Sequence, residues 1–99
     1  MLAILEPCLL PPRVNIRVIG EIDIASAPTL LTLARRSLDQ ECMSICMDLG
    51  EVTFMDSAGL AMLERAHAEA LARGGHVQVT RQSVSVRRIA NLVASSVLA

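Results

Sequence analysis

The residues best suited to chemistry are a polar pair in the middle of the chain, Asp56-Ser57, which precedes a run rich in alanine and leucine. The pattern predicts that this pair opens a helix and sets the Ser57 hydroxyl at or beside the first helical residue. Backbone N–H groups lack intrahelical partners there and the dipole is positive, so a phosphate is tolerated. Ser57 is therefore a candidate helix cap and a candidate phosphorylation site, where about −1.5 to −2 charges would be added beside Asp56.

No other set of residues assembles a conventional catalytic centre. The chain has no glycine-rich phosphate loop and no Gly-x-Ser-x-Gly motif. All nine basic residues are arginines, which excludes lysine-dependent chemistry. His67 lies ten helical residues beyond Ser57, about 15 Å away, which is too far for a nucleophile and its base. We expect a protein that is not an enzyme and that has no metal site and no cofactor.

Three cysteines, Cys8, Cys42 and Cys46, are an odd number and do not indicate a disulfide scaffold. Cys46 falls inside a predicted strand, and Cys42 comes just before it. Two interpretations stay open at this point. Cys46 is a buried reduced thiol, or Cys42 and Cys46 are a redox pair.

Composition places the chain among small globular domains. Its 99 residues are 53% hydrophobic, which is enough for one core. Phe54 is the only aromatic residue and the net charge is −1, so neither base stacking nor charge favours nucleic acid or an anionic membrane. There is no apolar run of about 18 residues, and Met1–Leu10 lacks the basic start of a signal peptide. We therefore expect a cytoplasmic protein without membrane insertion.

Hydrophobic patterning predicts alternating strands and helices after Met1–Arg13, which its prolines mark as an irregular segment or an edge strand. The predicted elements are the strand Val14–Val18, the helix Ala25–Gln40 capped by Ser26, the strand Ser44–Leu49, the helix Ser57–Arg73, the strand His76–Thr80 and the helix Val84–Val93 capped by Ser83. Gly50 begins a turn after the third of these, and Val97–Ala99 has the composition of a further strand. This order predicts an α/β domain with helices packed on a mixed sheet.

Single residues refine the prediction. Gly20 indicates a bulge or an unusual backbone dihedral at the end of its strand. Asp48 is expected to accept a hydrogen bond from the turn that follows it. Gly59 costs a helix about 0.5–1 kcal/mol relative to alanine, so either close helix–strand packing or a flat surface for a partner must favour it.

Several segments resemble the STAS domain and, within it, the bacterial anti-sigma-factor antagonists. They are Gly20-Glu21-Ile22-Asp23, Met47-Asp48-Leu49 and the stretch from Val52 to Asp56-Ser57-Ala58-Gly59-Leu60. The likeness extends from about Val14 to Val93. It implies one STAS-like domain over residues 1–99, with the carboxyl-terminal strand and helix of the family shortened.

The resemblance also implies a function. Family members bind an anti-sigma factor, commonly a serine kinase of the GHKL type, and so release a sigma factor. Ser57 matches the serine that this kinase phosphorylates to inactivate the antagonist and that a phosphatase restores. The implied partner-binding residues are Asp23, Asp56, Ser57, Ala58, Gly59 and Leu60.

Two further interpretations accompany the antagonist role. Short STAS proteins also serve as accessory subunits of ABC-type lipid transport complexes, although that pattern more often has threonine where Ser57 stands. A free sheet edge would also permit a homodimer. Direct binding of nucleic acid is not expected in either case.

Overall fold

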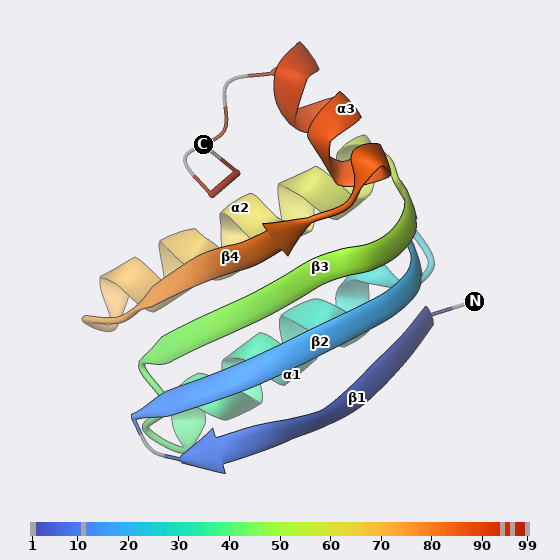
Figure 1. The fold of residues 1–99 in the computed structure, drawn as a ribbon. Helices are drawn as coiled ribbons and strands as arrows, with labels where there is room; N and C mark the ends of the chain where they lie inside the picture. Colours follow the sequence, from blue (N-terminus) through green and yellow to red (C-terminus); the bar gives the residue numbers. More distant parts are fainter. Residues whose placement is uncertain (1, 11, 94, 96, 99) are drawn as a thin grey trace.

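A four-stranded mixed sheet forms the centre of the structure (Figure 1). The computed structural model describes residues 2–10, 12–93, 95 and 97–98. The strands are β1 (Leu2–Leu10), β2 (Arg13–Ile22), β3 (Ser44–Met55) and β4 (His76–Gln82), and the helices are α1 (Ala27–Asp39), α2 (Ser57–Ala72) and α3 (Val84–Leu92). The strand order is β1-β2-β3-β4, with β1 antiparallel to β2 and the other neighbours parallel. The predicted α/β domain with a mixed sheet is confirmed.

The two long helices cover the same face of the sheet, behind it in Figure 1. Strand β2 explains this arrangement, because its residues alternate between the two faces. Val14, Ile16 and Val18 are buried toward the helices, whereas Arg13, Asn15 and Arg17 between them are exposed on the other face. The core is aliphatic throughout, and α1 completes it with Leu30, Ala34 and Leu38.

Strand β3 is longer than the sequence pattern predicts, and the turn expected at Gly50 is wrong. The strand continues to Met55 because β2 pairs with it beyond Gly50: Ile19 lies opposite Glu51, and Ile22 lies opposite Met55. Two register shifts in β2 accommodate this pairing, one of them directly after Gly20. Gly20 has a φ of 106°, which confirms the predicted unusual dihedral. The consequence is that a single residue, Asp56, separates the end of β3 from the start of α2.

The start of α1 is organised differently from the prediction. Ser26 is the N-cap residue, but its side chain makes no capping hydrogen bond, so the predicted hydroxyl cap is wrong. Its hydroxyl instead accepts the N–H of Asp23 at 2.9 Å and donates to the carbonyl oxygen of Glu21 at 2.9 Å. Pro28 lies in the first turn as predicted. Ser26 therefore tightens the turn between β2 and α1.

The two ends of the chain pack on this framework. The amino-terminal segment is the edge strand β1, and its register shifts between Leu5 and Cys8. At the other end the Ser83 hydroxyl accepts the N–H of Val86 at 3.2 Å, which confirms the predicted cap of α3. The helix ends at Leu92, one residue earlier than predicted, and Val93 follows it as an exposed residue.

The strand predicted for Val97–Ala99 is wrong for the two residues described, and Ala99 lies outside the described residues. Val97 and Leu98 are in a turn and are buried against the core. The amide of Gln82 donates to the carbonyl oxygen of Leu98 at 3.1 Å and holds this turn beside β4. None of the described helices is long and apolar enough to cross a bilayer.

Candidate functional site

Asp56, not Ser57, caps helix α2. The Oδ1 atom of Asp56 accepts the N–H of Gly59 at 2.9 Å, and its backbone oxygen accepts the N–H of Leu60 at 3.1 Å. The backbone of Asp56 is extended, as expected of an N-cap residue. The interpretation of Ser57 as the cap is therefore wrong, and the stabilising role belongs to its neighbour.

Ser57 is the first residue of α2 and its side chain is exposed. Among the described residues, its hydroxyl has no hydrogen-bond partner, and neither do the N–H groups of Ser57 and Ala58. Unpaired N–H groups at a helix start favour a negative charge. The hydroxyl is thus accessible, has no structural bond to break and lies where a phosphate would be tolerated.

The sheet brings Asp23 to the same edge of the molecule. Ile22 and Met55 pair across β2 and β3, so the residues that follow them, Asp23 and Asp56, lie at the adjacent carboxyl ends of two parallel strands. The Asp23 carboxylate accepts the N–H groups of Ala25 and Ser26, each at 3.0 Å. The N–H of Ser26 contributes most to lowering the pKa of Asp23, and the Ser26 hydroxyl, whose proton is shared between Asp23 and the carbonyl oxygen of Glu21, and the N–H of Ala25 add to it. Two acidic side chains, whose carboxylates both accept backbone N–H groups, therefore lie at this edge of the sheet, and Asp56 directly precedes Ser57.

Gly59 has a packing role that decides between the two explanations offered by the sequence. A Cβ atom at Gly59 would lie 2.7 Å from the carbonyl oxygen of Ile22 and 3.0 Å from Cγ of Met55. Such distances are too short for any side chain, so only glycine lets α2 start this close to the sheet. Gly59 is buried, and within the implied partner-binding set it positions its neighbours rather than offering a contact.

Next to Ser57 an apolar groove runs between α1 and α2, with a volume of about 420 Å³. We call it the α1–α2 groove; it is lined by Ile24, Ala27, Pro28, Leu31, Ala58, Ala61, Met62 and Arg65. Ile24 is 77% exposed, an unusual state for a large aliphatic side chain beside an apolar groove. Sequence reasoning missed Ile24. The available signal was one apolar residue in the polar turn after Asp23.

The remaining candidate residues lie elsewhere. Cys42 and Cys46 are both free and both buried, and their redox role stays a prediction. Asp48 accepts the N–H of Gly50 at 2.9 Å, but this bond lies within β3 and not at the predicted turn, and Asp48 also pairs with Arg81 at 3.3 Å. The part of the chain that the structure describes contains no group of three or more side chains able to hold a metal ion.

Comparisons with known proteins agree with the fold. The model of the STAS domain family matches residues 10–96. The chain is similar in structure to an anti-sigma factor antagonist from Mycobacterium paratuberculosis, with 25% sequence identity, a TM-score of 0.77, and coverage of 93% of this chain and 77% of that one. It is also similar to the anti-sigma factor antagonist SpoIIAA in its unphosphorylated form, with 22% identity, a TM-score of 0.77, and coverage of 91% and 79%. Similarity to Mglu, at 20% identity and a TM-score of 0.67, covers 76% of this chain and 19% of that one.

Proposed function

Because this chain belongs to the STAS domain family, we propose that it is an anti-sigma-factor antagonist that binds an anti-sigma factor of the serine-kinase type and releases a sigma factor. The observation that carries the proposal is the Ser57 hydroxyl, which is exposed at the first residue of α2 and has no hydrogen-bond partner in the described part of the chain. The similarity to the Mycobacterium paratuberculosis antagonist supports the same role. Such an antagonist would work in the cytoplasm.

The anti-sigma factor would dock over the start of α2 and the adjoining α1–α2 groove. The groove offers an apolar surface, and Ile24 projects beside it as an exposed anchor. Asp23 and Asp56 add negative charge at one end, so the partner should present a basic or hydrogen-bonding group there. Ala58 is half-buried in this surface, and Leu60 packs on the core beneath it.

Phosphorylation of Ser57 would switch this interface off. The Ser57 oxygen would attack the γ-phosphorus of ATP bound to the kinase, its proton would pass to a base on the kinase, and ADP would leave. The product is a phosphate carrying about −1.5 to −2 charges, next to the Asp56 carboxylate. The N–H groups of Ser57 and Ala58 would partly offset this charge, so the fold need not change. A docking partner would instead meet a bulky hydrated dianion, and a phosphatase would restore binding by hydrolysis.

Intact-mass spectrometry tests the proposal. The chain is incubated with ATP and the serine-kinase anti-sigma factor of the same organism, and we expect the mass of one phosphate to be added. Ser57→Ala should receive none, whereas Ser85→Ala should be phosphorylated like the unaltered chain. Ser85 is a suitable control because its hydroxyl already donates to the carbonyl oxygen of Thr53 at 2.7 Å. Phosphate on Ser57→Ala would contradict the assignment.

A further inference from the structure

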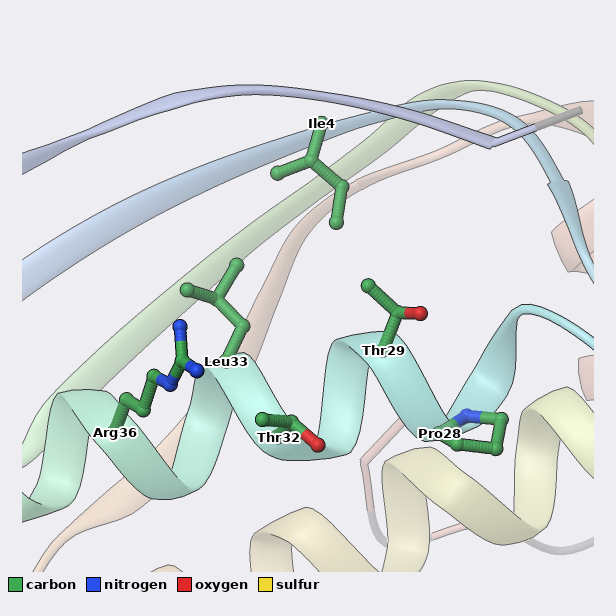
Figure 2. Close-up of a pocket in the computed structure, with 6 residues that line it drawn as sticks. All are labelled: Ile4, Pro28, Thr29, Thr32, Leu33 and Arg36. Carbon is green, nitrogen blue, oxygen red and sulfur yellow. The ribbon is translucent and has the colours of Figure 1, made fainter.

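A second apolar groove lies on the other side of α1, between this helix and the edge strand β1 (Figure 2). We call it the β1–α1 groove; it is lined by Ile4, Pro28, Thr29, Thr32, Leu33 and Arg36, and its volume is about 520 Å³. In Figure 2 Ile4 points from the strand toward the helix, where Leu33 and Thr29 point back toward it. The volume is within the range of small-molecule sites, which is roughly 300–1,000 Å³.

Arg36 gives this groove a cationic end. Its guanidinium extends beside Leu33 toward the strand (Figure 2) and has no ion pair among the described residues. The neighbouring charges are already satisfied: Arg35 pairs with Glu69 at 2.8 Å, and Asp39, one turn further along α1, pairs with Arg73 at 2.9 Å. Arg36 is therefore available to an anion, and guanidinium groups bind carboxylates through two parallel hydrogen bonds.

We propose that the β1–α1 groove binds a single-chain amphiphile with a carboxylate head, such as a medium-chain fatty acid. The carboxylate pairs with Arg36, and the aliphatic tail lies between Ile4 and Leu33 toward Pro28. Two hydroxyls, those of Thr29 and Thr32, lie on the helix side of the groove and have no hydrogen bond to any described residue. The Thr32 hydroxyl, about one helical turn from Arg36, can bind the head group or its waters, whereas Thr29 lies along the tail.

The length of the groove supports this ligand. Thr29 and Arg36 are seven residues apart on α1, a distance of about 10 Å along the helix axis. An octanoate molecule has that extent. A purely apolar ligand would leave Arg36 unused, and a cationic amphiphile would be repelled by it. The site is independent of the proposed antagonist role, because it lies on the opposite side of α1 from the α1–α2 groove. Pro28 lines both grooves, and the other lining residues differ.

Titration of the full chain with sodium octanoate, followed by proton–nitrogen NMR, tests the proposal. We expect saturable shifts centred on Thr29, Thr32 and Leu33. Arg36→Gln should weaken binding about tenfold or more, because a charge-assisted hydrogen-bond pair is lost. Arg88→Gln is the matched control: Arg88 is also exposed and without an ion pair among the described residues, but it lies on α3, and its loss should leave the affinity unchanged.

Other outcomes would overturn the proposal. Octylamine has the same tail and the opposite charge, so equal affinity for octylamine and octanoate would exclude recognition by Arg36. Absence of saturable shifts, or equal weakening by Arg36→Gln and Arg88→Gln, would do the same. Leu33→Trp should fill the groove and abolish octanoate binding while thermal unfolding remains cooperative. If this variant unfolds cooperatively and binds octanoate like the unaltered chain, the groove is not the site.

Discussion

Two adjacent polar side chains at the start of α2 have separate tasks. The Asp56 carboxylate bonds to the backbone of its own helix, whereas the Ser57 hydroxyl projects outward without a partner among the described residues. A residue that both capped the helix and accepted phosphate would lose the cap on each modification. Dividing the tasks allows Ser57 to be phosphorylated and dephosphorylated at little cost to the helix.

This division predicts different effects on stability. Asp56→Ala should lower the free energy of unfolding by about 1 kcal/mol, because Gly59 loses its hydrogen-bond acceptor. Ser57→Ala should change it by less than about 0.5 kcal/mol, because no bond is lost. Urea unfolding followed by circular dichroism measures both. A larger loss in Ser57→Ala than in Asp56→Ala would show that the serine is the structural residue after all.

Among the secondary-structure elements, the close approach of α2 to the end of β2 depends on one missing side chain. Gly59→Ala should cost about 1–3 kcal/mol of unfolding free energy, since the added methyl meets the backbone oxygen of Ile22 at 2.7 Å. Gly50→Ala is the control. Its methyl would meet the guanidinium of Arg81 at 2.8 Å, a flexible group that can move, so its effect should stay within about 1 kcal/mol. Equal costs for the two variants would contradict the packing role of Gly59.

Helices α1 and α2 are joined by an ion pair with a pH dependence. The guanidinium of Arg35 donates two hydrogen bonds of 2.8 Å to Glu69, and these bonds, with the charges of Arg35 and Arg65, lower the pKa of Glu69 from 4.5 to about 2. A lowered carboxyl pKa contributes stability that is present above the unfolded value and lost as pH falls through the folded value. The contribution of Glu69 should therefore disappear between about pH 5 and about pH 2.

The variant Glu69→Gln isolates this effect. The difference in urea midpoint between the unaltered chain and Glu69→Gln should be largest near neutral pH and should shrink steadily in acid. Asp39→Asn removes the carboxylate that pairs α1 with Arg73, the C-cap residue of α2; the Asp39 side chain is 69% exposed, so the midpoint should change little. A difference between the unaltered chain and Glu69→Gln that stays constant with pH would show that the pair is not coupled to folding.

The regular elements could be predicted because their patterns are local. Period-two alternation identified β2 and β4, and the spacing of Leu30, Ala34 and Leu38 identified α1. The second half of β3 could not be predicted from the sequence, because Gly50-Glu51-Val52-Thr53 has the composition of a turn. Only its pairing with β2 makes it a strand. The cap of α2 was equally undecidable, since aspartate and serine are both good N-caps and the backbone geometry chooses between them. The exposure of Ile24 likewise depends on the fold of the preceding turn.

At the scale of the whole molecule, two grooves lie on either side of α1, and we propose a different kind of ligand for each. The α1–α2 groove adjoins Ser57 and suits a protein partner. The β1–α1 groove has a cation, Arg36, without an ion pair among the described residues and suits a small amphiphile. The opposite face of the sheet instead has exposed polar side chains, among them the ion pair between Arg17 and Glu51. The proposed antagonist surface is thus confined to one end of the helical layer.

Ile24 tests the extent of that surface. Ile24→Asp should weaken binding to the anti-sigma factor about tenfold or more, because an exposed apolar anchor is replaced by a charge beside Asp23. Leu71→Asp is the matched control, since Leu71 is also exposed but lies at the other end of α2. Surface plasmon resonance measures both affinities. Equal binding by the two variants would place the interface elsewhere.

The affinity of the anti-sigma factor for the unphosphorylated chain, for the chain phosphorylated on Ser57 and for Ser57→Ala, measured by isothermal titration calorimetry, tests the central claim most directly. We expect the unphosphorylated chain and Ser57→Ala to bind with similar affinity. Phosphorylation should weaken binding by about a hundredfold or more, because a dianion is placed in the interface beside Asp56. A phosphorylated chain that binds as tightly as the unphosphorylated one would contradict the switch at Ser57.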